Sequence, residues 1–164
     1  MTYIPDLSPY DYLPDTVPAG VEVLAVGWLD PGHDFPTADD DAGDDADADA
    51  DTDVDPVFGR NLITLAADHF TAATRGVHGC RFRHLIEADF QYHAVYGTRV
   101  LFLGHAEIRV VTPDGRWLSA PTLVVHYIRD HGYRPPAEFV EAVTAMRVAP
   151  GDGGHRDGGA GARI

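Results

Sequence analysis

The chain has 164 residues, enough for one domain with a single hydrophobic core, and its formal net charge is −14. Ten of the 26 acidic residues lie between Asp39 and Asp55, so the rest of the chain has 16 acidic against 12 basic residues, a balance of −4. No run of arginines with interleaved aromatic residues occurs, and repulsion from phosphate therefore disfavours direct binding to nucleic acid.

The sequence favours a soluble protein in a reducing compartment. No stretch approaches the roughly 18 to 20 consecutive apolar residues of a membrane helix, and the first residues lack the basic and then apolar layout of a secretory signal. The only cysteine is Cys80, so no intramolecular disulfide can form. We therefore expect a cytoplasmic protein that does not contact a membrane.

The first third of the chain contains an extended segment, a strand and an acidic insert. Residues 3–18 hold four prolines among tyrosines, which predicts an extended segment lying over the surface. Residues 21–29 (VEVLAVGWL) predict a buried strand. Residues 38–55 contain almost only Asp, Ala, Gly and Thr, and we expect a disordered insert there. Its alternating aspartates could attract calcium, but the glycine and closing glutamate of a calcium-binding loop are missing.

The middle of the chain predicts one helix and a β-hairpin. Pro56 opens a stretch whose apolar residues recur at helical spacing, and Gly76 could end that helix. Residues 99–103 and 106–111 predict strands. The second strand leads through the turn residues 112–115 into residues 116–118, which predicts an antiparallel hairpin.

The last part of the chain predicts two helices and a tail. Ser119 could cap a helix that has Pro121 in its first turn and ends at Gly132. A second helix should run from Ala137 to Met146, and the glycine-rich tail 149–164 should be disordered. We predict one small α+β domain formed by residues 1–37 and 56–148, in which a short antiparallel sheet or hairpin is covered by the early helix and the C-terminal helical pair.

Several long strings resemble an uncharacterised bacterial family that is common in actinobacteria. They are residues 103–110 (LGHAEIRV), 114–121 (DGRWLSAP) and 126–143 (HYIRDHGYRPPAEFVEAV). The opening strings 6–10 (DLSPY), 27–33 (GWLDPGH) and 35–37 (FPT) agree with it, so the resemblance covers nearly all of the chain except the acidic insert and the tail. The family has no established activity, and the resemblance therefore implies no function by itself.

The resemblance implies a candidate metal element. Members of the family usually carry a His-x-Cys-x-x-Cys element between the first helix and the hairpin, which resembles a zinc knuckle. In this chain the element is His78-Gly79-Cys80-Arg81-Phe82-Arg83, so Arg83 stands in the place of the second cysteine. Whether the altered knuckle binds metal is therefore open.

Zinc takes four ligands in a tetrahedron, and the chain offers histidines in place of the lost cysteine. We predict His78, Cys80, His84 and His126 as the candidate zinc ligands, with His131 as an alternative to His126. Because two histidines five residues apart do not share one helical face, at most one of them should join. The alternative is that Cys80 is a small, half-buried residue and the histidines only form hydrogen bonds.

Two hypotheses about function remain. The first is a non-enzymatic cytoplasmic module that binds a protein partner and contains the altered zinc knuckle. The second is a small hydrolase or transferase in which a histidine activates Cys80 and Glu107 orients that histidine. Glu107 and Arg109 share one face of a strand, where they either line a pocket with His105 or belong to a polar sheet face with a cross-strand ion pair. The positions of the cysteine and the histidines in space decide between these interpretations.

Overall fold

The computed structural model describes residues 3–37, 55–84 and 92–151. Within these ranges the chain forms an α+β domain, as the sequence predicts. The elements in chain order are η1 (Pro14–Thr16), β1 (Val23–Ala25), α1 (Pro56–Asp68), β2 (His93–Tyr96), β3 (Arg99–Phe102), β4 (Glu107–Val111), β5 (Trp117–Pro121), α2 (Val124–His131) and α3 (Ala137–Thr144). No helix in the described ranges has the length and apolar character needed to cross a bilayer.

The main sheet has the order β1-β5-β4, with β5 in the centre. Strands β4 and β5 form the predicted antiparallel hairpin, in which Val111 pairs with Trp117 and Glu107 with Pro121. Strand β1 pairs with β5 in parallel, which the sequence analysis did not predict. The sheet is therefore mixed, and its central strand joins the first part of the chain to the last.

Both faces of this sheet are covered. On one face, alternate residues of β4 and β5, such as Ile108 and Leu118, pack with the apolar sides of all three α-helices in the main core. On the other face, Trp117 packs with Tyr10 and Trp28 in a second cluster built largely from the N-terminal segment. The predicted extended segment with aromatic anchors is confirmed, since Tyr10 is 8% exposed and the segment bridges to β1 at Leu24.

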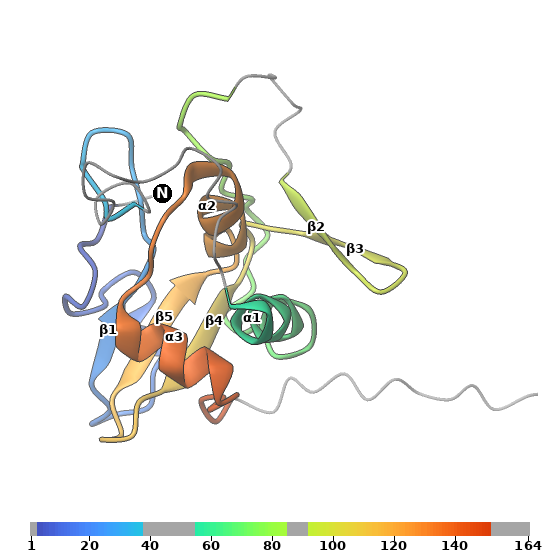
Figure 1. Ribbon diagram of the computed structural model, residues 1–164. Helices are drawn as coiled ribbons and strands as arrows, with labels where there is room; N and C mark the ends of the chain where they lie inside the picture. Colours follow the sequence, from blue (N-terminus) through green and yellow to red (C-terminus); the bar gives the residue numbers. More distant parts are fainter. Residues whose placement is uncertain (1–2, 38–54, 85–91, 152–164) are drawn as a thin grey trace, which may run out of the picture.

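Strands β2 and β3 form a separate two-stranded antiparallel sheet that projects away from the rest of the chain (Figure 1). The pairing of the two strands continues at their base, where the N–H of Leu103 donates to the carbonyl of Tyr92 at 2.8 Å. Next to the turn, Arg99 forms an ion pair with Asp68 at the end of α1. Only the strand from Arg99 was predicted, and β2 was missed because its four residues carry a weak pattern of alternation.

Two predicted boundaries are wrong, and a third is confirmed. Helix α1 ends at Asp68, eight residues before Gly76, because the backbone of Thr71 pairs with Glu107 and draws the chain along the edge of β4. Ser119 does not cap a helix; Ser119 and Pro121 belong to β5, whose pairing with β4 continues to Pro121. Gly132 ends α2 as predicted, in the left-handed conformation with φ of 64°.

The predicted acidic insert 38–55 lies outside the described residues except for Asp55. The carboxylate of Asp55 accepts a hydrogen bond from the N–H of Val57 at 2.8 Å and so caps α1. The predicted tail 149–164 lies outside them from residue 152 onward. Within it, the N–H of Ala149 donates to the carbonyl of Arg109 at 2.9 Å, which attaches this end of the chain to β4.

Gly104 fixes the segment that follows α1 against the sheet. The N–H of His78 donates to its carbonyl at 2.7 Å, and a Cβ added at Gly104 would overlap the carbonyl oxygen of His78. The φ of Gly104 is +87°, a conformation that favours glycine. This contact holds the start of the Cys80 segment close to the end of β3.

We predict that Gly104→Ala lowers the free energy of unfolding by more than about 3 kcal/mol, because the strained φ and the overlap with His78 add. Gly115→Ala is the matched control, since Gly115 has a φ of +91° but nothing within 4 Å of an added Cβ. It should cost only about 1 to 2 kcal/mol. Urea denaturation measures both, and equal losses would show that the contact with His78 is unimportant.

Candidate metal centre

Four side chains that can bind a metal ion converge between the segment after α1 and helix α2. They are Cys80 and His84 on that segment, and His126 and His131 on α2. All four ligand atoms lie within 4.8 Å of one another. The Nε2 atom of His131 is 3.1 Å from that of His84, 3.2 Å from that of His126 and 3.3 Å from Sγ of Cys80. The His84 and His126 Nε2 atoms are 3.1 Å apart.

Three of the four residues predicted as ligands, Cys80, His84 and His126, are therefore brought together, and His78 is not among them. The Nε2 atom of His78 lies 2.6 Å from the hydroxyl oxygen of Tyr12, on the side of the N-terminal segment. Arg83 is exposed and lies outside the cluster. The structure thus places His84 beside Cys80, one residue beyond the position of the missing cysteine.

The expectation that at most one of the two α2 histidines joins the site is wrong. Both rings point their Nε2 atoms to the same place, with their planes at 82° to each other. An imidazole is long enough for Nε2 to leave the helix face on which its Cβ lies, and His131 is the last residue of α2. Spacing on the helix surface therefore underestimates the reach of these two side chains.

Aromatic rings enclose the cluster. The ring of Tyr92 lies 4.2 Å from that of His126 and 5.3 Å from that of His84, measured between centroids. The ring of Phe82 lies 5.0 Å from that of His131 and also packs against Tyr127. These apolar walls lower the local dielectric, which strengthens interactions between charges in the site.

Burial sets the protonation of the cluster. It lowers the pKa of His126, which is 1% exposed, to about 4, so this imidazole is neutral at pH 7 and offers a lone pair. Burial also raises the pKa of the Cys80 thiol to about 11, although a hydrogen bond from the backbone N–H of Phe82 opposes this effect. Without a bound cation the thiol is therefore protonated, the opposite of an activated nucleophile.

The carboxylate of Asp130 lies beside Nδ1 of His126, the ring nitrogen that does not face the cluster. Its Oδ2 atom lies 2.5 Å from Nδ1 of His126, one helical turn away on α2. The contact lacks the geometry of a regular hydrogen bond, and Nδ1 has no other partner among the described residues. A carboxylate beside Nδ1 favours the tautomer that leaves the Nε2 lone pair free. The sequence analysis missed Asp130, although its spacing of four residues from His126 could have indicated it.

Sequence comparison places the chain in a family. Residues 2–144 match the domain of unknown function DUF7919. The chain belongs to the DUF7919 family. No curated protein and no solved structure matches it. The resemblance to an uncharacterised family is therefore confirmed, and the geometry of the site is what indicates the function of this DUF7919 domain.

A second group of polar residues in the DUF7919 domain lies on the other face of the main sheet. Glu107 and Arg109 form an ion pair at 2.8 Å, with side chains only 3% and 4% exposed. The carboxylate of Glu107 also accepts hydrogen bonds from the hydroxyls of Tyr10 at 2.5 Å and Ser119 at 2.8 Å. The two charges are thus paired, but the pair lies within β4 and is buried, whereas the plainer interpretation expected a cross-strand ion pair on a polar face. The cluster around Cys80 does not include Glu107.

We predict that Glu107→Gln lowers the free energy of unfolding by about 3 to 5 kcal/mol, because it leaves the Arg109 guanidinium buried without its counter-charge. Glu138→Gln is the control: it breaks the half-exposed pair with Arg116 and should cost less than about 1 kcal/mol. Urea denaturation compares the two variants. A small loss for Glu107→Gln would mean that the buried pair contributes little to the attachment of the N-terminal segment.

Proposed function

We propose that this DUF7919 domain binds one zinc ion through Sγ of Cys80 and the Nε2 atoms of His84, His126 and His131, and that the ion has a structural role. The observation that carries the proposal is the convergence of four soft or borderline ligand atoms from two separate segments. Nitrogen and sulfur ligands of this kind suit zinc and disfavour magnesium and calcium, which prefer oxygen.

The three imidazole nitrogens cannot satisfy one another. Their Nε2 atoms form a triangle with sides of 3.1 to 3.2 Å. A neutral imidazole carries one N–H, and a single N–H can point at only one lone pair. Any arrangement of protons therefore leaves lone pairs facing each other or a donor without a partner, which is costly in a half-buried site. A cation at the centre of the cluster removes this conflict.

The spacing of the ligand atoms fits a tetrahedral ion. Zinc lies about 2.0 to 2.1 Å from imidazole nitrogen, so the edge of a regular tetrahedron of such ligands is about 3.3 to 3.4 Å. The nitrogen atoms are 3.1 to 3.2 Å apart, and Sγ of Cys80 is 3.3 Å from Nε2 of His131. Small side-chain movements would complete the coordination.

Charge balance also supports zinc. A divalent ion with one thiolate and three neutral imidazoles carries a net charge of +1, and Asp130, next to His126, supplies the opposite charge. The pKa of the Asp130 carboxyl is lowered, chiefly by its hydrogen bond with Arg129, so it is ionised at pH 7. The ion in turn would favour the thiolate of Cys80, because its positive charge stabilises the buried negative charge.

A structural role follows from the number of ligands. Four protein ligands fill a tetrahedral site and leave no position for a reacting water. The ion would join the Cys80 segment to α2. Tyr92 packs on His126 and its carbonyl accepts from the N–H of Leu103, so fixing His126 would also help to fix the base of the β2–β3 hairpin. We propose a non-enzymatic, zinc-stabilised module that acts by binding a protein partner. A reduced Cys80 thiol suits a cytoplasmic location.

We expect purified protein to contain about one zinc ion per chain, measured by inductively coupled plasma mass spectrometry. Cys80→Ser and His131→Asn should each lose the ion during dialysis against a weak chelator. His78→Asn is the matched control, since His78 belongs to the same segment but contacts Tyr12 instead of the cluster, and it should keep the metal. Chelation of the native protein should lower its melting temperature by about 10 °C.

Two results would contradict this proposal. Native protein without zinc, that also fails to bind added zinc or cobalt, would show that the histidines only form hydrogen bonds. Loss of zinc from His78→Asn with retention in His131→Asn would move the site to the other side of the Cys80 segment. In either case the structural role would fail with the site.

Asp130→Asn should weaken zinc binding about 10-fold to 100-fold, because the ring of His126 loses the carboxylate that orients it and increases its basicity. Competition with a chromophoric chelator measures the affinity. Asp114→Asn is the control, since it removes an exposed carboxylate that pairs with Arg116 in the β4–β5 turn. Equal affinities for the two variants would show that the contact between Asp130 and His126 has no effect on the metal.

A further inference from the structure

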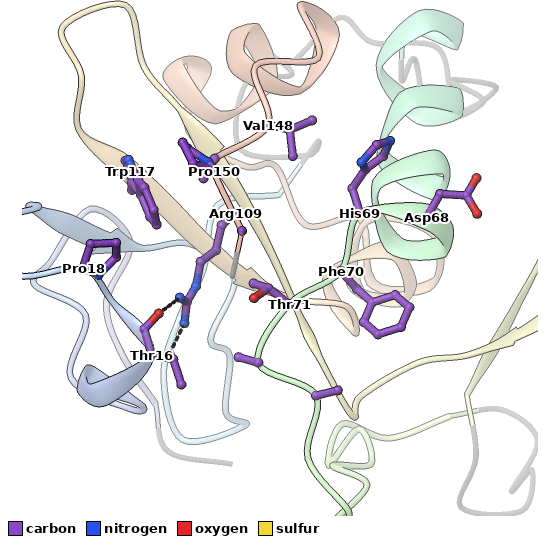
Figure 2. A pocket seen from close by; sticks show the side chains of 14 residues that line it. Thr16, Pro18, Asp68, His69, Phe70, Thr71, Arg109, Trp117, Val148 and Pro150 are labelled. Carbon is purple, nitrogen blue, oxygen red and sulfur yellow. Dashed lines mark hydrogen bonds between the residues drawn. The ribbon is translucent and has the colours of Figure 1, made fainter. Parts of the chain in front are cut away.

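A cavity of about 440 Å³ opens on the N-terminal side of the main sheet, away from the metal centre. Its floor is β4 at Arg109, and its walls come from the segment after η1, the segment after α1 and the segment after α3 (Figure 2). Cavities of about 300 to 1,000 Å³ are the usual size of small-molecule sites. The size therefore permits a ligand, and the chemistry of the floor indicates which kind.

The edge of β4 is covered by two different segments with a gap between them. The N–H and carbonyl of Glu107 both pair with Thr71, and the carbonyl of Arg109 accepts from the N–H of Ala149 at 2.9 Å. The N–H of Val111 donates to the carbonyl of Arg147. The first segment thus ends and the second begins at Arg109.

The peptide N–H of Arg109 lies in this gap. The groups of alternate residues in an antiparallel pair point to opposite edges. Because Ile108 and Val110 occupy the positions that bond to β5, the N–H of Arg109 points outward, between Thr71 and Ala149. No acceptor pairs with it among the residues that the structure describes, although Arg109 is only 4% exposed. Because this N–H faces the cavity, an acceptor atom placed there can form a hydrogen bond that no described residue supplies.

The side chain of Arg109 does not make the cavity a site for anions. Its Nε and Nη2 atoms donate to Glu107, and Nη1 and Nη2 donate to the carbonyl and hydroxyl oxygens of Thr16 at 2.6 and 2.5 Å. Figure 2 shows the two contacts with Thr16 at the floor of the cavity. The charge of the guanidinium is neutralised by Glu107, so an uncharged acceptor is favoured over a carboxylate or phosphate.

Apolar and polar groups share the walls of the cavity. Trp117 and Pro18 lie to one side of Arg109, as Figure 2 shows. Phe70 lies to the other side, and its ring points away from Arg109. The rings of Trp117 and Pro18 therefore provide the apolar surface beside the peptide N–H, and such a surface suits a ring.

We infer that this cavity is a binding site for a small ring-bearing molecule whose uncharged carbonyl oxygen accepts a hydrogen bond from the peptide N–H of Arg109. The ring packs against Trp117 and Pro18. This inference is independent of the proposed zinc site, which lies on the other side of the sheet and shares no residue with the cavity.

The test is a titration of the ¹⁵N-labelled, metal-loaded protein followed by NMR. The probes are benzamide, benzoate and toluene, which share a ring but carry an uncharged acceptor, a charged acceptor and no acceptor. Benzamide should shift the Arg109 amide and the Trp117 indole resonances in a saturable way, with a dissociation constant that is roughly millimolar. Benzoate and toluene should bind at least 5-fold more weakly.

Variants locate the site. Ala73→Phe places a ring at the rim of the cavity and should weaken benzamide binding at least 10-fold. Ala145→Phe is the matched control, because Ala145 is also exposed but lies outside the cavity, and its affinity should be unchanged.

The inference is overturned if benzamide causes no saturable shift, since water then satisfies the Arg109 N–H as well as a ligand does. Equal binding of benzamide and toluene would show that the acceptor plays no part. Binding of benzoate at least as tight as that of benzamide would contradict the neutral pairing of Arg109 with Glu107. Unchanged affinity in Ala73→Phe would place the ligand elsewhere.

Discussion

The organisation of the structure around α2 depends on how four lone pairs are satisfied in one half-buried space. Three imidazole nitrogens and a sulfur meet within 4.8 Å, and they cannot pair completely with one another. Several constraints hold these side chains: Gly104 brings in the segment that carries Cys80 and His84, α2 positions the other two histidines, and Tyr92 and Phe82 close the space. A zinc ion would turn this conflict into the strongest link between the middle of the chain and its C-terminal part.

The opposite face of the main sheet has a different chemistry. There the N-terminal segment supplies Tyr10 and Thr16 to a buried ion pair, so this face is stabilised by the pairing of Glu107 with Arg109. The segments that cover β4 leave one peptide N–H exposed to a cavity. The sheet thus separates two sites, one that suits a cation and one that suits an uncharged acceptor.

Local sequence predicted the features that depend on local chemistry. The turn at residues 112–115 predicted the β4–β5 hairpin, Gly132 predicted the end of α2, and Pro136 predicted the start of α3. Long-range pairing was not predictable in the same way. The parallel pairing of β1 with β5 and the early end of α1 both follow from contacts between distant segments, which no local pattern records.

The same difference between local and long-range information applies to the candidate metal centre. The resemblance to a zinc knuckle indicated Cys80 as a ligand, and His84 and His126 were predicted as further ligands. The sequence could not show whether His78 or His131 lies in the cluster. His78 is close to Cys80 in sequence and His131 is on the same helix as His126, and only the path of the folded chain shows that His131 contacts Cys80 whereas His78 contacts Tyr12. No sequence pattern predicts the gap at Arg109. One of the two segments that border it precedes the β4–β5 hairpin in the chain, and the other follows it.

The most direct test of the account is X-ray absorption spectroscopy at the zinc edge of the purified, zinc-loaded protein. We predict one sulfur ligand at about 2.3 Å and three nitrogen ligands at about 2.0 to 2.1 Å, with the scattering pattern of imidazole rings. A shell that lacks sulfur, or that consists mainly of oxygen, would contradict coordination by Cys80, His84, His126 and His131.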